Sequence, residues 1–189
     1  MIVSVRVHLD RLARAFWLTL GLAFAASVEG CAQVPVENAK EVRCAGTSNH
    51  HDGDTFTCAL GGTTAAFVVR VASVDAPETG QAYWRVARAR LRELASQGCT
   101  VRCYKVDRYE RRVCRLRTAD GRDAADVLLS EGLAWYPEGY AHEDAPVDRA
   151  RYQHLQAEAR SAKLGIWSEP DPMPPRTCRE LRRAGGSCR

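Results

Sequence analysis

Short runs of strand-forming apolar residues characterise much of the chain beyond residue 40. Such strand-like patterns cover residues 55–60, 64–74, 100–106 and 112–117. The Gly61-Gly62 pair between the first two segments predicts a hairpin turn. A charged run at residues 107–111 separates the last two and predicts a solvated turn. The pattern therefore predicts several short strands joined by tight turns.

Three other stretches repeat apolar residues every three or four positions, as amphipathic helices do. They cover residues 83–96, 123–131 and 148–163. In the first stretch, Ala87, Leu91 and Leu94 form one apolar stripe, and a glycine follows each stretch and predicts its end. Strands interspersed with helices predict an α+β fold in which a small β-barrel carries about three helices.

The N-terminal 32 residues have a pattern of their own. Arg6, Arg11 and Arg14 precede an uncharged apolar run at residues 15–28. This run is too short to cross a hydrocarbon core of about 30 Å comfortably, which favours an export signal over a membrane-spanning helix. Residues 1–32 are therefore predicted to be a signal peptide, with the protein exported to the periplasm or the medium.

The cleavage point has two interpretations. Small residues at 23–25 and at 30–32 both suit a signal peptidase. Residues 28–31, Val-Glu-Gly-Cys, also resemble a bacterial lipoprotein box, in which Cys31 would carry lipid and become the new N-terminus, although Glu29 replaces the usual small residue. Contact with a membrane is expected only through such an anchor at Cys31.

Composition narrows the class of protein. A chain of 189 residues with 46% hydrophobic residues and a net charge of +4 suits one folded domain and excludes disordered and collagen-like chains. Eight cysteines exceed what a core of this size needs and indicate an oxidising compartment. The expected organisation is a polar lead-in at residues 33–41, a domain at residues 42–169, and a Pro-rich linker with a Cys- and Arg-rich tail at residues 170–189.

Acidic residues cluster at two predicted strand ends. Asp52-Gly53-Asp54-Thr55 opens one strand, and Asp75-Ala76-Pro77-Glu78 follows the next. Carboxylates that converge there would suit a hard cation such as Ca²⁺, which binds carboxylate and carbonyl oxygens. Each motif alone also has a purely structural interpretation, the first as a turn and the second as a helix start with an acidic first turn.

One arginine interrupts an apolar strand. Arg70 lies within Phe67-Val68-Val69-Arg70-Val71-Ala72, where a guanidinium is costly unless it has a partner or faces an opening. The alternative is an arginine that extends to solvent along the barrel surface. Because side chains alternate along a strand, Arg70 and Asp75 can share one side only if the chain bends near Ser73 or the strand ends before Asp75.

Five ordered segments together resemble the staphylococcal nuclease (thermonuclease) family. They are Asp52-Gly53-Asp54-Thr55, Arg70 with Val74-Asp75-Ala76-Pro77-Glu78-Thr79, Asp107-Arg108-Tyr109-Glu110-Arg111, Gly132-Leu133-Ala134, and Lys163-Leu164-Gly165-Ile166-Trp167-Ser168-Glu169. The resemblance spans about residues 42–169. Five matching segments in the family's order and spacing make it specific.

This resemblance implies a five-stranded OB-fold barrel with three helices and a Ca²⁺-dependent phosphodiesterase that cuts DNA and/or RNA, leaving a 3′-phosphate. It also implies a role for each matched residue. Asp54 and Asp75 would bind the cation through carboxylates and Ala76 through its carbonyl, Glu78 would orient or deprotonate water, Arg70 and Arg111 would hold the phosphate, and Tyr109 would line the site. Electrostatics supports the set, because an anionic phosphodiester needs cationic groups where its transition state gathers charge.

Two positions depart from the family pattern. Ala76 stands where the family usually has Thr, a change that leaves the backbone carbonyl in place. Glu110 stands where the family usually has Gly, and if this position needs a positive φ, Glu costs on the order of 1 kcal/mol. Glu110 could also pair with Arg111 and compete with substrate phosphate.

The cysteines permit several pairings. Cys103 and Cys114 lie on the two strands that flank the charged turn, so a cross-strand disulfide is plausible. The next candidate pairs are Cys44 with Cys58 and Cys178 with Cys188, while Cys99 either pairs with Cys31 or stays free. A zinc site of Cys44, His50, His51 and Cys58 is the alternative, although it lacks the usual closely spaced pairs.

The favoured hypothesis is an exported, monomeric, Ca²⁺-dependent nuclease. The rival is an OB-fold module that has lost catalysis and binds single-stranded nucleic acid through a basic groove and aromatic side chains. The carboxylates distinguish the two, because Asp54, Asp75 and Glu78 would repel phosphate unless a cation lay between them.

Overall fold

The computed structural model describes residues 39–188. The predicted signal peptide, the lipoprotein alternative at Cys31 and most of the polar lead-in lie outside these residues. Within residues 39–188, no helix is both long and apolar enough to span a lipid bilayer.

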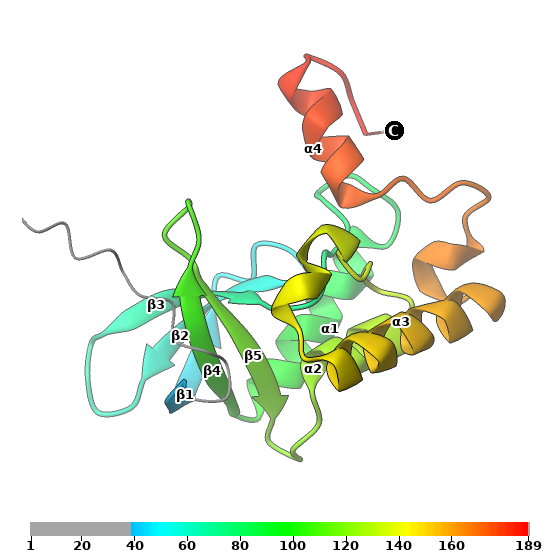
Figure 1. The fold of residues 1–189 in the computed structure, drawn as a ribbon. Coiled ribbons are helices and arrows are strands. Elements are labelled where there is room, and N and C mark those ends of the chain that lie inside the picture. Colours follow the sequence, from blue (N-terminus) through cyan, green and yellow to red (C-terminus); the bar gives the residue numbers. More distant parts are fainter. Residues whose placement is uncertain (1–38, 189) are drawn as a thin grey trace, which may run out of the picture. The chain divides into compact units, whose positions relative to one another are not determined.

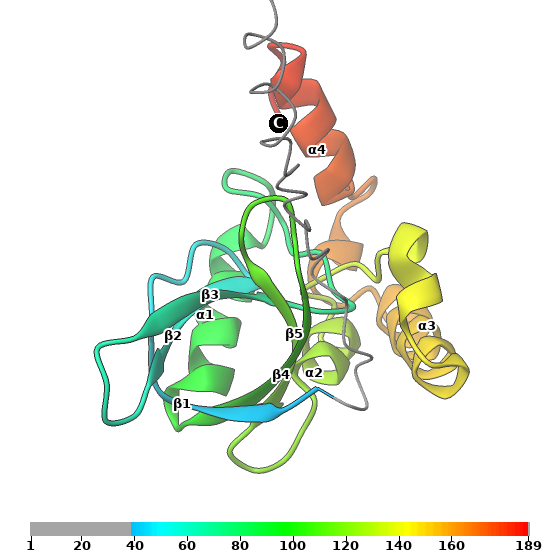
Figure 2. The same cartoon turned by 60° about the vertical axis from the view of Figure 1, so that its left-hand side comes forward.

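Five strands close into a barrel in the order β1-β2-β3-β5-β4 (Figure 1). The strands are β1 (Glu41–Ser48), β2 (Thr55–Leu60), β3 (Ala66–Val71), β4 (Cys99–Val106) and β5 (Arg112–Thr118). All neighbouring pairs are antiparallel except β3 and β5, which run parallel and complete the barrel. Figure 2 shows the strands as a ring. The predicted α+β fold with a five-stranded OB-fold barrel is confirmed.

The β2–β3 hairpin carries the central part of the candidate site. Its turn contains Gly62 at φ 74°, a conformation that glycine adopts without strain, as the Gly-Gly pair predicts. The third strand is shorter than the predicted 64–74 and ends at Val71. Ser73 then adopts φ 62°. The required bend is therefore present, and Asp75 lies beyond the strand end.

Helices cover one end and one side of the barrel. They are α1 (Trp84–Ser96), α2 (Ala124–Ser130), α3 (Pro146–Ser161) and α4 (Pro175–Arg183), with 3₁₀ turns η2 (Glu138–Glu143) and η3 (Gly165–Ser168). The predicted stripe of Ala87, Leu91 and Leu94 on α1 is buried in the main core. The side chain of Asp123 caps α2 by accepting from Ala125 N–H at 2.9 Å.

Three disulfides join the pairs proposed from the sequence, Cys44–Cys58, Cys103–Cys114 and Cys178–Cys188. Among the described residues Cys99 has no disulfide partner, and Cys31, its proposed partner, lies outside them. Cys99 is buried, which raises the pKa of its thiol to about 11. The zinc interpretation is wrong, because Cys44 and Cys58 bond to each other. His50, one of its two proposed histidine ligands, stacks on Phe56 with ring centroids 5.7 Å apart.

One strand and one α-helix have no counterpart among the predicted elements. Strand β1 pairs with both β2 and β4, and its pairing with β2 shifts register between Cys44 and Gly46. Helix α4 begins at Pro175, the last residue of the predicted linker, because proline is tolerated at the first helical position. Of its side chains, only Pro175 and Cys178 are buried.

Candidate active site

The two predicted cation-binding carboxylates come from separate segments that the strand pairing brings together. Asp54 immediately precedes β2; its N–H donates to Asp52 Oδ1 (3.0 Å) and its carbonyl accepts from Val71 N–H (2.8 Å). Asp75 follows β3 and exchanges two backbone hydrogen bonds with Trp135, of 2.8 and 2.9 Å. Both carboxylates are largely buried, with exposed fractions of 3% and 8%.

Arg70 links these carboxylates. It lies opposite Thr55 in the β2–β3 register, so its side chain starts beside Asp54. Its guanidinium approaches Asp54 Oδ2 and Asp75 Oδ1, each at 3.2 Å, and donates to the Val71 carbonyl at 2.7 Å. Arg70 is thus a paired, buried cation and not an arginine extended to solvent.

Asp54 is the most enclosed acid of the group. Its Oδ2 accepts from the Ala76 N–H and its Oδ1 from the Thr55 hydroxyl, both at 2.8 Å. Burial raises the pKa of Asp54 to about 6, against the opposing effect of the Arg70 charge. The single guanidinium of Arg70 therefore does not offset the desolvation of Asp54, and a further cation nearby would favour the ionised form.

A glycine lets this loop lie close to α1. A Cβ atom on Gly53 would lie 2.6 Å from the Ala87 Cβ and 2.8 Å from the Ala76 Cβ, distances that real Cβ atoms do not reach. The close approach places Asp54 within reach of the Ala76 amide. Gly53 is therefore a packing requirement of the site as well as a turn residue.

Arg111 approaches the same carboxylates from the tip of the β4–β5 hairpin. Asp107 accepts from the Arg111 backbone N–H (3.0 Å) and Nε (2.9 Å), which fixes the side chain. Arg111 Nη1 then reaches the Thr55 hydroxyl at 3.3 Å, and this hydroxyl donates to Asp54. Asp107 and Thr55 thus position Arg111, a role for both that the sequence analysis did not assign.

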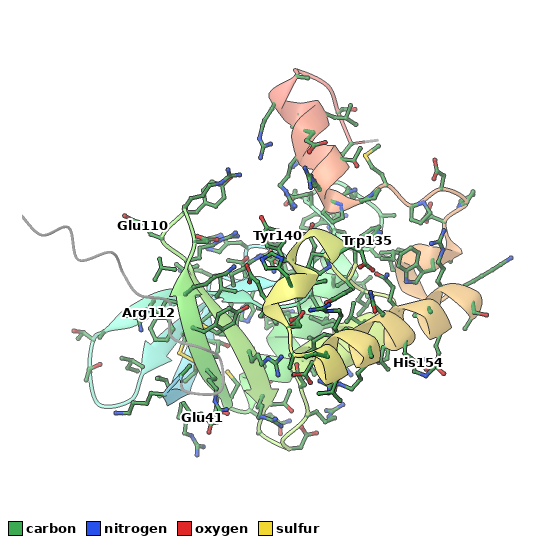
Figure 3. The ribbon with its side chains drawn as sticks, in the orientation of Figure 1. Glu41, Glu110, Arg112, Trp135, Tyr140 and His154 are labelled. Carbon is green, nitrogen blue, oxygen red and sulfur yellow. A yellow bond between two sulfur atoms is a disulfide. The ribbon has the colours of Figure 1, made fainter. Side chains whose placement is uncertain are left out.

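Glu110 stands where the staphylococcal nuclease family usually has glycine, and its backbone is strained. Its φ is 61°, so a residue with a Cβ atom stands where glycine would be free of strain. Figure 3 shows it at the tip of the hairpin. Within the described residues Glu110 forms no ion pair with Arg111, which pairs instead with Asp107 at 2.8 Å. The expected competition for Arg111 is therefore not seen.

Tyr109 lies beside Glu110 on the exposed side of the tip, with 58% of its surface accessible. The guanidinium carbons of Arg108 and Arg111 lie 4.9 and 5.3 Å from its ring centroid. A hydrogen bond with Arg108 and the charge of that residue lower the pKa of the phenol. Tyr109 offers an aromatic surface between two cations at the mouth of the site.

Glu78 lies beside Asp75, three residues further along the chain. One guanidinium nitrogen, Nη1 of Arg179, donates to Asp75 Oδ1 at 3.1 Å and to Glu78 Oε1 at 2.6 Å. Arg179 belongs to α4, and the sequence analysis gave it no role. A basic tail is most often a solvated surface, so its composition gave no reason to place one of its arginines in the site.

An open cleft of about 590 Å³ joins these groups. Six of the seven predicted site residues line it: Asp54, Arg70, Asp75, Glu78, Tyr109 and Arg111. Ala76, the seventh, lies beneath and donates its N–H to Asp54. Lys105, Arg108, Arg179 and Arg183 add positive charge to the wall. The cleft thus combines buried acids at its base with cations around its mouth.

The donor set at the base fits a hard divalent cation. Asp54 and Asp75 each present a carboxylate oxygen to the same guanidinium, so the two acids lie close enough to share one cation. Carboxylates are the ligands that Ca²⁺ prefers in proteins. No group of three or more His, Cys, Asp or Glu side chains forms a metal site among residues 39–188, so a cation here would also need backbone carbonyls or water.

Comparison with known proteins shows which family the chain belongs to. The sequence model of the staphylococcal nuclease homologue family matches residues 68–169. The chain belongs to the staphylococcal nuclease family. Micrococcal nuclease from Shigella flexneri is 35% identical over 133 residues, covering 66% of this chain and 73% of that protein. An uncharacterized endonuclease from Escherichia coli O157:H7 is 34% identical over 126 residues, covering 66% and 76%.

A plant relative extends the range of the family. Staphylococcal-like nuclease CAN1 from Arabidopsis thaliana is 30% identical over 120 residues, which are 63% of this chain and 35% of that protein. Membership of the staphylococcal nuclease family makes the chain a nuclease, a hydrolase whose substrate is nucleic acid. Residues 170–188, which include α4, lie beyond the part that the family model matches.

Proposed function

We propose that this nuclease hydrolyses phosphodiester bonds of DNA and/or RNA with Ca²⁺ as its cofactor. The main support is the meeting of two buried carboxylates from different segments, Asp54 and Asp75, with Arg70 and Arg111 in one open cleft. Buried like charges are costly, and a fold keeps them together where a cation is to be held.

The residues divide into cation-binding and phosphate-binding groups. Asp54 and Asp75 would hold Ca²⁺ through carboxylates and Ala76 through its carbonyl. Bound there, Ca²⁺ would offset the charge of the phosphate and stabilise the charge that develops on it. Arg70 and Arg111 have guanidinium groups whose fork matches two phosphate oxygens. Tyr109 would flank the substrate at the mouth of the cleft.

Glu78 would orient the attacking water or accept its proton. The oxygen of this water bonds to phosphorus while the bond to the 5′ oxygen breaks. The products are a 3′-phosphate and a 5′-hydroxyl, and the proton that the water loses balances the one that the 5′ oxygen gains. Because Glu78 now accepts a hydrogen bond from Arg179, it becomes available as a base only when that contact is released.

The second candidate function is a binding module without catalysis. Its support is the basic mouth of the cleft, where Tyr109 stacks between arginines and could receive a base. The acidic base of the cleft argues against it, because Asp54 and Asp75 would weaken phosphate binding in the absence of a cation.

Export is the remaining part of the proposal. Three disulfides within residues 39–188 support an oxidising compartment, the periplasm or the medium. Residues 1–32 would act as the signal peptide, with Cys31 as the lipid-bearing residue in the lipoprotein alternative. Intact-mass spectrometry of the mature, non-reduced protein tests both. A mass that retains residues 1–32 would contradict export by this signal.

Digestion of plasmid DNA, single-stranded DNA and RNA, with Ca²⁺ or with a chelator, tests the catalytic proposal. We expect cleavage only with Ca²⁺, and a loss of at least about 10²-fold in Asp54→Asn and Arg111→Ala. Asp120→Asn is the matched control, because Asp120 is exposed and pairs only with nearby Arg122 and Thr118. Intact nucleic-acid binding without Ca²⁺-dependent cleavage would replace the enzyme by the binding module.

A further inference from the structure

The C-terminal helix places an arginine on the acids that are proposed to bind the cation. Arg179 directs both terminal nitrogens at Asp75: Nη2 donates to Oδ2 at 2.8 Å and Nη1 to Oδ1 at 3.1 Å. The same Nη1 donates to Glu78 Oε1 at 2.6 Å. One guanidinium therefore engages both oxygens of Asp75 and one oxygen of Glu78.

These contacts leave little of Asp75 free for another cation. Its Oδ1 also receives Arg70 Nη2 at 3.2 Å, so the carboxylate lies between two guanidiniums. Partial burial lowers the pKa of the Arg179 guanidinium, but the hydrogen bonds that it donates to Asp75 and Glu78, together with the charges of these acids, outweigh this effect and raise the pKa. Arg179 is thus held in its charged form.

Several contacts hold α4 against the site. Gln81 Nε2 donates to the Met173 carbonyl at 2.7 Å, which fixes the segment before the helix. Arg182 donates to the Thr79 carbonyl, beside Glu78. The Cys178–Cys188 disulfide closes the chain end back onto the helix, and Cys178 is fully buried. Tethering in this way gives the Arg179 side chain a high effective concentration at Asp75.

We propose that Arg179 is a built-in competitor of the divalent cation and limits how tightly Ca²⁺ binds to Asp75. This inference rests on the proposed Ca²⁺ function. A Ca²⁺ ion takes carboxylate oxygens at about 2.3–2.6 Å. Arg179 and Arg70 together occupy most of the lone-pair sites of Asp75, and the positive charge of Arg179 repels a cation that approaches the same oxygens. Ca²⁺ loading therefore requires Arg179 to withdraw, and the same movement frees Glu78 for water. The apparent Ca²⁺ affinity falls by the fraction of molecules in which Arg179 has withdrawn.

A direct role for Arg179 in substrate binding fits the contacts less well. Among the described residues, every hydrogen bond of Arg179 ends on a carboxylate, whereas a phosphate ligand would leave donors free toward the cleft. Arg183, one turn further along α4, lines the cleft and has no carboxylate partner among the described residues. Arg182 Nη1 also approaches Glu78 Oε2, at 3.8 Å, but Arg179 is the residue of α4 that contacts both acids.

Isothermal titration of Ca²⁺ into the full-length, oxidised protein tests the proposal without an activity readout. Arg179→Ala is expected to bind Ca²⁺ roughly tenfold more tightly than the unmodified protein. Arg176→Ala is the matched control, because Arg176 lies on the same helix, is 79% exposed and pairs only with Glu180. Its Ca²⁺ affinity is expected to equal that of the unmodified protein.

Thermal unfolding provides a second measurement that also shows whether the variant folds. In chelator, Arg179→Ala is expected to have a lower Tm than the unmodified protein, because Asp75 and Glu78 lose their shared cation. Added Ca²⁺ should then raise the Tm of Arg179→Ala more than that of the unmodified protein. Arg179→Gln keeps a hydrogen-bond donor but no charge. It should also have a lower Tm in chelator and a larger rise in Tm with Ca²⁺.

Two outcomes would overturn the competitor role, and a third would overturn the proposed function on which it rests. One is a Ca²⁺ affinity in Arg179→Ala that is equal to or weaker than that of the unmodified protein. Another is an unchanged Ca²⁺ affinity with weaker binding of single-stranded DNA, which would make Arg179 a substrate ligand. If neither protein binds Ca²⁺ and the unmodified protein does not cleave DNA with it, the proposed function itself fails. Ca²⁺-dependent cleavage with no effect of Arg179→Ala on affinity refutes only the competition.

Discussion

The base of the cleft and the β4–β5 tip carry charge in two different ways. At the base, Arg70 lies between Asp54 and Asp75, all three are mostly buried, and strand pairing fixes their spacing. At the tip, Arg111 is held by Asp107 on an exposed turn. Buried charges depend on one another for stability, whereas a surface pair contributes little. Substitutions at the base should therefore change both the unfolding free energy and the cleavage rate, whereas substitutions at the tip should change mainly the cleavage rate.

Removing the central cation of the base should have the largest effect. Arg70→Ala leaves Asp54 and Asp75 buried with less compensation, so we expect a loss of about 3 kcal/mol in unfolding free energy and about 10³-fold in cleavage rate. Urea denaturation and DNA digestion measure the two. Arg70→Lys, which keeps the charge, should recover part of the stability. A fully stable Arg70→Ala protein would refute the coupling of stability and activity at the base.

The corresponding change at the tip should separate the two properties. Arg111→Ala is expected to lower the cleavage rate by about 10²-fold and to change stability by less than about 1 kcal/mol, because the Arg111–Asp107 pair is only partly buried. The matched control is Arg112→Ala, whose guanidinium packs on the Phe67 ring at 4.2 Å. That control should retain its cleavage rate. If Arg111→Ala destabilises the protein as much as Arg70→Ala does, the tip contributes to stability as the base does, which contradicts this prediction.

The disulfide below the tip tests how firmly the hairpin is anchored. Replacing Cys103 and Cys114 together by alanine should cost about 2 kcal/mol in stability, since the bond closes a short loop around the tip. The cleavage rate should fall only several-fold, because Asp107 still holds Arg111. Denaturation and digestion of the double variant check both. A loss of cleavage as large as that of Arg111→Ala would show that Asp107 alone does not position the arginine.

Relieving the backbone strain at the tip should have the smallest effect. Glu110→Gly is expected to raise the unfolding free energy by roughly 0.5–1 kcal/mol, because glycine adopts a positive φ without strain although it adds entropy to the unfolded chain. The Tm measures this gain. Glu110→Ala removes the charge but keeps the Cβ atom, so it should give no gain. An equal gain in both variants would assign the effect to charge and not to backbone conformation.

Local patterns predicted much of the fold. The hairpin glycines and the α1 stripe follow from short-range sequence rules, and the structure bears them out. The bend at Ser73 meets the condition under which Arg70 and Asp75 can share one side, although the predicted strand ran on to residue 74. Strand β1 escaped prediction because only Cys44 is fully buried in it and the register shift before Gly46 breaks its alternation. Helix α4 escaped because it buries too few side chains for an apolar period to show.

The candidate site was predictable residue by residue but not as an arrangement. The motifs singled out Asp54, Asp75 and Arg70, yet their contact depends on the β2–β3 register and on the chain path after Val71. Thr55, Asp107 and Arg179 act through contacts with other segments, and composition alone carries no signal of such contacts. Arg179 is separated from Asp75 by 104 positions, so only the tertiary fold brings them together.

The two backbone hydrogen bonds between Asp75 and Trp135 limit how often the segment around Asp75 can open. Because each residue donates its amide to the other, the segment proposed to bind the cation cannot leave the barrel without detaching from the chain that leads to η2. The amide protons of Asp75 and Trp135 should therefore exchange with deuterium at similar, slow rates, close to those of the barrel strands and slower than those of a surface loop. Their exchange rate therefore measures how often this segment opens, and the measurement needs neither substrate nor metal.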